Sequence, residues 1–175
     1  EIRASGRRGE VWYTDATTIH YEERPAAGVV VAVNLGASVS YIDDAGVVWE
    51  ADLSPDGARR THRRIAMTRD EPLFQTAREG ITAYRLDVPD GVYEVEIGLA
   101  EVDARVAPGE RVVSVLVNGA SLFRDVDLVR DYGPYTAVRR KIVVPAAGGN
   151  GIEVRFAAAA GSPLAAAVAV RRVPR

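Results

Sequence analysis

Apolar and polar residues alternate along several stretches of the chain, which is the period of strands with one buried face. The alternation is clearest over residues 93–99, 113–117 and 152–156. Further strands, some of them apolar on both faces, are predicted over residues 29–33, 82–88, 138–144 and 164–173. No stretch keeps a helical period over ten or more residues. The pattern therefore predicts an all-β protein.

Turn-forming residues separate these predicted strands. Asn118 and Gly119 both tolerate a positive φ, so they predict a tight type I′ hairpin. Other turns are predicted at residues 43–46, 89–91, 108–109 and 148–151. Seven or more short strands at this spacing are typical of an antiparallel sandwich or barrel. We predict a jelly-roll β-sandwich.

Two segments lie outside this strand rhythm. Residues 50–72 form a long polar stretch, which is uncommon in a domain unless it is functional or covers a sheet edge. Residues 1–28 carry aromatic residues among charges. They are either an added edge hairpin or the last strands of a preceding domain. We therefore divide the chain into an N-terminal extension, residues 1–28, and one domain, residues 29–173.

The composition narrows the classes of function. The chain has 175 residues, 47% of them hydrophobic, and a formal net charge of −2, so no overall field attracts nucleic acid or an anionic membrane. It has no cysteine, which excludes disulfides, thiolate zinc sites and a cysteine nucleophile. The longest apolar stretch, residues 156–170, is interrupted and too short to span a bilayer. We expect neither nucleic acid nor a membrane as a partner.

Motifs for catalysis and cofactors are sparse. The chain has no Gly-x-Ser-x-Gly, Walker or Gly-x-Gly-x-x-Gly motif, and His20 and His62 are its only histidines. Glu101 and Asp103 stand two residues apart at a strand end, where an acid–base pair is conceivable but solvated or arginine-paired carboxylates are more common. The chain is thus predicted not to be an enzyme and to need no cofactor. A structural calcium ion at Asp43 and Asp44 is an alternative to an ordinary hairpin turn.

Arginines and aromatic residues are the remaining candidates for ligand contacts. Of the 22 basic residues only Lys141 is a lysine. The arginine cluster of residues 59–64 could bind an anionic sugar or a phosphate, or form a solvated loop or an interdomain contact. Sugar-binding sandwiches use aromatic faces flanked by carboxylates and amides. Some aromatic residues at loops or strand ends could stack against a sugar or could form the rim of the core. They are Trp49, Phe74, Tyr132 and Tyr135.

Six blocks, in order, resemble the malectin domain, also classified as carbohydrate-binding module family 57. The second, residues 44–52, is similar to the family's Asp-x-Gly-x-x-Trp-x-x-Asp motif, and the third, residues 73–78, to Leu-Tyr-Gln-Thr-x-Arg. The others are residues 32–36 (Ala-Val-Asn-Leu-Gly), 88–101, 109–119 and 161–168. The resemblance covers residues 29–173 and implies a galactose-binding-like jelly roll with a non-catalytic, carbohydrate-binding role.

Three further stretches, residues 81–85, 132–135 and 137–140, resemble the malectin-type modules near the C-terminus of bacterial glycoside hydrolase family 2 enzymes such as β-galactosidases. This resemblance implies a parent enzyme whose catalytic glutamates lie in a separate barrel, and other domains of that enzyme as partners. The first residue, Glu1, is not methionine, so we expect an excised or processed module. By the same inference we expect a secreted or periplasmic bacterial protein.

The resemblance also bears on the ligand residues. Animal malectin holds a glucose disaccharide with aromatic side chains and an aspartate, whose positions correspond here to residues 79–80, 103–104 and 161. The aromatic cage is therefore absent from this chain. Two hypotheses follow. The loops at one end bind a galactoside, glucoside or plant-type glycan, or the domain has lost sugar binding and serves interdomain packing or oligomerisation. Candidate carbohydrate-binding residues are Trp49, Arg63, Phe74, Arg78, Glu101 and Asp103.

Overall fold

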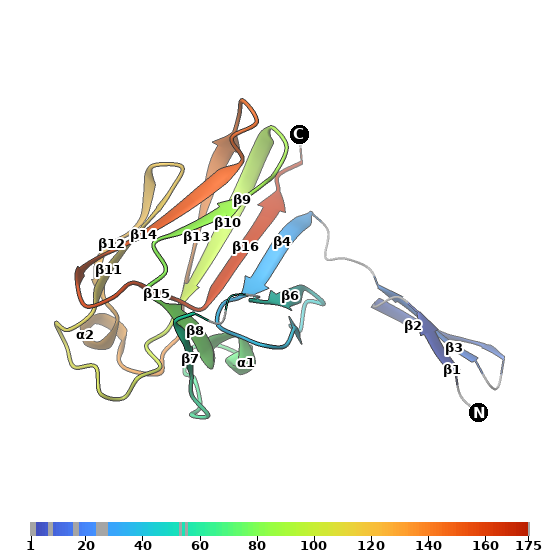
Figure 1. Ribbon diagram of the computed structural model, residues 1–175. Helices are drawn as coiled ribbons and strands as arrows, with labels where there is room; N and C mark the ends of the chain where they lie inside the picture. The colour runs from blue at the N-terminus through green and yellow to red at the C-terminus, as the bar shows by residue number, and fades with distance from the viewer. Residues whose placement is uncertain are drawn as a thin grey trace.

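The computed structural model describes residues 3–6, 9–15, 18–23, 28–52, 54 and 56–174, with side chains from residue 28 onward. Two β-sheets face each other across the core (Figure 1). The larger has the order β13 (Val138–Ala146), β10 (Gly91–Leu99), β16 (Ala167–Arg172), β4 (Val29–Asn34), β6 (Val48–Ala51) and β5 (Tyr41–Ile42). The smaller has the order β12 (Ala120–Asp127), β11 (Val112–Val117), β14 (Ile152–Ala160) and β9 (Ala83–Leu86).

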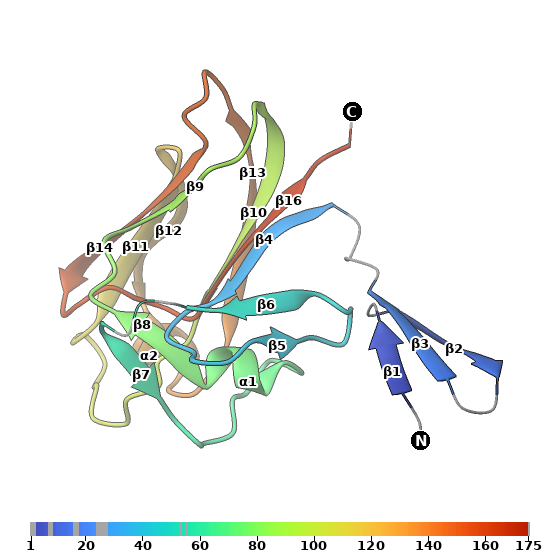
Figure 2. The same cartoon turned by 45° about the vertical axis from the view of Figure 1, so that its right-hand side comes forward.

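A small third sheet and two short helices lie near one end of the sandwich (Figure 2). The sheet has the order β15 (Leu164–Ala165), β8 (Thr76–Glu79) and β7 (Ala58–Arg60). The helices are α1 (Glu71–Phe74) and α2 (Leu128–Tyr132). Among the residues described, no helix is long and apolar enough to cross a membrane.

The N-terminal residues form strands of their own. These are β1 (Arg3–Gly6), β2 (Gly9–Asp15) and β3 (Thr18–Glu23), which hydrogen-bond in the order β1-β3-β2. The role of residues 1–28, an added hairpin or part of a preceding domain, stays a prediction.

The core is built by the alternating residues that the sequence pattern singled out. From β10, Tyr93, Val95, Ile97 and Leu99 are completely buried, and from the facing sheet Val115 is buried as well. The predicted all-β sandwich is thus confirmed, including the absence of long helices from the described part of the chain. Its driving force is the apolar area that the two sheets remove from water.

The predicted hairpin at residues 118–119 is also confirmed. Asn118 and Gly119 join β11 to β12 with φ angles of 46° and 81°. Positive φ at both central residues is what a type I′ turn requires.

Residues 50–72 hold more structure than their polar sequence indicated. They contain the end of β6, strand β7 and the start of α1, although β7 itself is wholly exposed. An edge strand with no buried face has no alternating pattern, so periodicity could not reveal it. The sequence pattern did not predict strand β12 either. The pairing of β12 with β11 has an irregular register, which interrupts the alternation of apolar and polar residues there.

A second apolar layer covers one end of the outer face of the larger sheet. Trp49 of β6 and Phe74 of α1 are both completely buried in it. The Phe74 ring lies so close to Gly98 of β10 that a Cβ at that glycine would come within 2.8 Å of it. Glycine inside a strand often marks such a close approach. The guanidinium carbon of Arg139 lies 4.8 Å from the centre of the Phe74 ring.

Because Phe74 fills this layer, we expect Phe74→Ala to lower the free energy of unfolding by about 3–5 kcal/mol, the cost of a large buried cavity. Chemical denaturation followed by tryptophan fluorescence measures it. The matched control is Val143→Ala, whose side chain is exposed, with an expected change within about 0.5 kcal/mol. A denaturation midpoint for Phe74→Ala equal to that of the wild type would contradict the packing role of Phe74.

Candidate functional site

The candidate site is the end of the sandwich formed by residues 56–59, 79–80, 101–111 and 161–163, called here the loop end. Arg111 lies at its centre and is 5% exposed. Its Nε donates to Glu101 Oε2 at 2.6 Å, and its Nη1 donates to Glu79 Oε1 at 3.0 Å and to the Ser162 carbonyl at 2.6 Å. One guanidinium therefore joins the end of β8, the segment that follows β10 and the turn before β15.

Glu101, a predicted ligand residue, is 1% exposed. Its second carboxylate oxygen accepts a hydrogen bond from the backbone N–H of Asp103 at 2.9 Å. Both oxygens therefore serve the internal structure. In this structure Glu101 supports the loop and presents no carboxylate to a ligand.

Asp103 and Glu79 are two carboxylates of the loop end that are partly exposed and paired with arginines. Arg105 forks onto Asp103 with Nε to Oδ1 at 2.9 Å and Nη2 to Oδ2 at 2.7 Å. These hydrogen bonds hold the pKa of the Asp103 carboxyl well below its usual range. Burial alone would raise the pKa of Glu79, but hydrogen bonds from Arg59 and Arg111 outweigh it and lower that pKa. Both acids are held ionised and oriented by arginines.

The structure also explains why an animal-type cage does not fit here. At residue 161, where the family aspartate falls, Gly161 has a φ of +67°, and a Cβ would collide with the Glu110 carbonyl oxygen. Any side chain there would strain the backbone and its neighbour. An aspartate at residue 161 would therefore require the neighbouring backbone to move.

Of the predicted aromatic residues, Tyr135 adjoins the loop end, because its backbone N–H donates to the Glu101 carbonyl at 2.9 Å, whereas Trp49 and Phe74 lie elsewhere. Trp49 and Phe74 are 0% exposed, so neither ring offers a face to a sugar in this structure. Trp49 donates from Nε1 to Asp43 Oδ2 at 3.0 Å. Their burial supports the interpretation that these two rings belong to the core and do not form a stacking platform.

The two remaining predicted residues have separate partners. Arg78 lies 3.6 Å from Asp52 Oδ1, and the guanidinium carbon of Arg63 stands 5.4 Å from the centre of the Tyr135 ring. The structure therefore brings together Glu101 with Asp103 and Trp49 with Phe74, but not all six residues in one site. The glycan-binding role of the loop-end residues stays a prediction.

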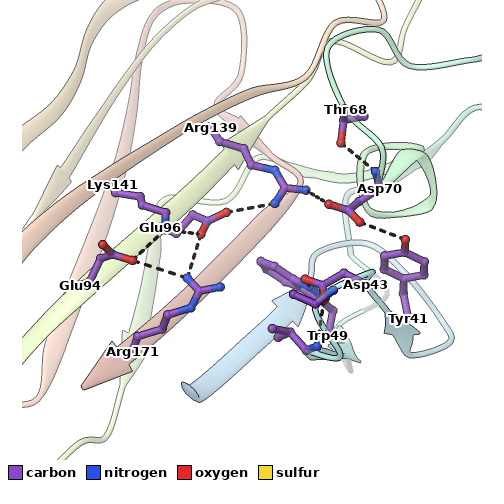
Figure 3. A network of polar contacts seen from close by, with 12 residues as sticks. Tyr41, Asp43, Trp49, Thr68, Asp70, Glu94, Glu96, Arg139, Lys141 and Arg171 are labelled. Atoms are coloured by element: carbon purple, nitrogen blue, oxygen red, sulfur yellow. Dashed lines mark hydrogen bonds and ion pairs between the residues drawn. The ribbon is translucent and has the colours of Figure 1, made fainter. Parts of the chain in front are cut away.

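A second polar network crosses the outer face of the larger sheet (Figure 3). Its centre is Glu96, 4% exposed, which meets Arg171 at 2.8 Å, Arg139 at 3.2 Å and Lys141 at 3.5 Å. Glu96 and Lys141 face each other in the β10–β13 register, where opposite charges stabilise a sheet. A groove of about 670 Å³ with mostly charged walls lies beside this network, partly lined by Glu96.

Asp43 shows how its turn is built. Its Oδ1 accepts from the backbone N–H groups of Ala45 and Val47, each at 2.9 Å, and its Oδ2 accepts from Trp49. These contacts match the hairpin-turn alternative. No cluster of three or more potential metal-ligating side chains occurs in the described part of the chain.

Two residues that organise the loop end were not singled out from the sequence. Arg111 belongs to the fifth resemblance block, but nothing in its local pattern indicates burial beside Glu101. Arg105 follows Asp103 by two residues, a spacing that could have indicated the fork between their side chains. The pairing of Arg111 needs the fold, because its partners are 10 and 32 residues away.

Comparison with known proteins agrees with this architecture. A family model described as the malectin domain matches residues 29–164. The chain belongs to the malectin domain family. Malectin domains are carbohydrate-binding modules rather than catalytic domains. No curated protein sequence matches the chain significantly.

Solved structures give the same fold in larger proteins. The β-glucuronidase of Bacteroides uniformis is 25% identical with a TM-score of 0.76, over 89% of this chain and 20% of the enzyme. The plant receptor-like kinase FER is 14% identical (TM-score 0.65; 84% of this chain, 50% of that one). The ANX1 ectodomain of Arabidopsis thaliana is 10% identical (TM-score 0.64; 84% and 49%), and both receptors show the fold alone. The chain spans about a fifth of the length of the glucuronidase.

We expect Glu101→Gln to lower the free energy of unfolding by about 3 kcal/mol, because it removes the buried carboxylate bonded to Arg111 Nε and leaves Glu79 as the remaining ionic partner of that buried charge. The control is Glu153→Gln, which breaks the surface pairs with Arg85 and Arg155 and should cost about 1 kcal/mol or less. Urea unfolding at neutral pH compares them. Equal small effects would contradict the structural role of the Arg111–Glu101 pair.

Proposed function

We propose that this chain is a carbohydrate-binding accessory domain of a glycoside hydrolase and that its loop end contacts the glycan. The observation that carries the proposal is the malectin match over residues 29–164. The likeness to a fifth of a β-glucuronidase supports a multidomain parent enzyme. Like other polysaccharide-handling modules, the domain would act outside the cytoplasm, as a secreted or periplasmic bacterial protein.

The exposed chemistry of the loop end suits hydroxyl groups. The side chain of Arg105 is 88% exposed and that of Arg59 is 50% exposed, and each is paired with a carboxylate. A fixed guanidinium–carboxylate pair presents donors and acceptors in one plane, which can bond two neighbouring hydroxyls of a galactoside or glucoside. Without an aromatic platform the apolar contribution is missing, so we expect weak binding.

A second candidate is interdomain packing without sugar binding. It is favoured by the internal pairing of Glu79, Glu101 and Asp103, each of which already has an arginine partner. It is also favoured by exposed Val30, Val92 and Val143 on strands of the larger sheet. The two candidates differ in whether the isolated chain binds a glycan.

A glycan array followed by calorimetric titration tests the proposal. We expect weak binding of a galactoside or glucoside, reduced about tenfold or more by Asp103→Ala or Arg105→Ala, because each removes hydrogen bonds to a charged group. Arg155→Ala, on β14, is the control and should bind like the wild type. We expect no hydrolysis of chromogenic galactosides or glucuronides.

Two results would contradict this account. Failure to bind any neutral or acidic glycan would favour the packing candidate. Hydrolysis by the purified chain would overturn its assignment as a non-catalytic domain.

A further inference from the structure

A cavity separate from the loop end lies between the end of β4, the segment leading into β5, and α1. Its volume is about 220 Å³. Drug-sized ligands occupy pockets of about 300–1,000 Å³, so this cavity suits a single small ring. Its lining residues are Asn34, Ala37, Val39, Ser40, Tyr41, Arg60, Thr61, His62, Pro72, Gln75 and Thr76.

Tyr41 gives the cavity an oriented aromatic wall. Its hydroxyl donates to Asp70 Oδ1 at 3.3 Å, and Asp70 is held in turn by Arg139 at 2.7 Å and by its own backbone bond to Thr68 at 3.0 Å (Figure 3). Because three elements fix this arrangement, the ring keeps its position without a ligand. Aromatic faces of this kind pack against the apolar face of a pyranose.

Neutral polar groups complete the wall. Gln75 donates from Nε2 to the Arg63 carbonyl at 3.1 Å, which fixes the plane of its amide. Thr76 donates to buried Asn34 Oδ1 at 2.8 Å, so the floor of the cavity is rigid. Exposed Val39 adds apolar contact area at the same cavity. An oriented ring with amides and hydroxyls is the combination that recognises a sugar.

The charge of the lining argues for a neutral ligand. The described residues that line the cavity include no carboxylate, and Arg60 is the one guanidinium among them. The groove beside Glu96 differs, because four carboxylates and five cations line it and its Glu96 is already paired with three of those cations. Hydroxyl groups there would compete with ion pairs, whereas most of the polar side chains that line the cavity are neutral.

We propose that this cavity is a second saccharide subsite, which binds one neutral monosaccharide ring through Tyr41 and Gln75. The class of ligand in this proposal rests on the proposed carbohydrate-binding function. The location of the subsite rests on the cavity itself. The proposal assigns to Tyr41 and Gln75 a role independent of Asp103 and Arg105. The two places on the domain can then contact separate sugar units.

The test is a titration of the ¹⁵N-labelled chain with methyl β-galactoside and methyl β-glucoside, followed by backbone chemical shifts. We expect shifts at residues 39–41, 61–62 and 75, and affinity about tenfold weaker in Tyr41→Ala and in Gln75→Ala. Tyr41→Phe keeps the aromatic face and should retain binding. Ile42→Ala, the neighbouring exposed residue, is the control, and thermal unfolding verifies that each variant is folded.

The outcomes separate this proposal from the proposed function. Binding that Tyr41→Ala weakens and Asp103→Ala leaves intact supports the subsite. Binding that Asp103→Ala abolishes and both cavity variants leave intact overturns the subsite while the loop end stands. Absence of binding to both methyl glycosides overturns the subsite, and the glycan array then decides the proposed function separately.

Discussion

The buried guanidinium of Arg111 determines the shape of the loop end. It lies between Glu101 and Glu79 and also bonds to the Ser162 carbonyl, so segments from three parts of the chain meet on one side chain. Burying ions is costly, and the cost is offset only when the pairing is geometrically good and the remaining polar atoms are bonded. The backbone N–H of Asp103 supplies that completion for Glu101.

This arrangement has a consequence for function. Because Glu101 and Arg111 are buried and bonded to each other, the ion pairs that reach the surface of the loop end are Arg105 with Asp103 and Arg59 with Glu79. Under the proposed function, the binding surface of this malectin domain would be polar and charged. Such a surface gains specificity from fixed hydrogen bonds and loses the apolar contribution of stacking.

The fold was largely predictable from the sequence, and the site was not. The alternation in residues 93–99 reflects burial of one sheet face, and Gly119 reflects the positive φ of its turn. The local sequence pattern was therefore enough to predict both the strand and the hairpin. Trp49 and Phe74 resemble ligand aromatics in the sequence, yet both are buried, and Phe74 packs over Gly98 in a contact that only the tertiary structure creates. Burial of Glu101 likewise depends on Arg111, which reaches it from the loop residue just before β11.

The most direct test of the central claim is a crystal structure of this chain bound to the glycan that an array selects. The account predicts sugar hydroxyls within hydrogen-bond distance of the Asp103 carboxylate and the Arg105 guanidinium, with Glu101 still bonded to Arg111. A glycan bound elsewhere with the loop end empty, or a glycan that displaces Arg111 from Glu101, would contradict it.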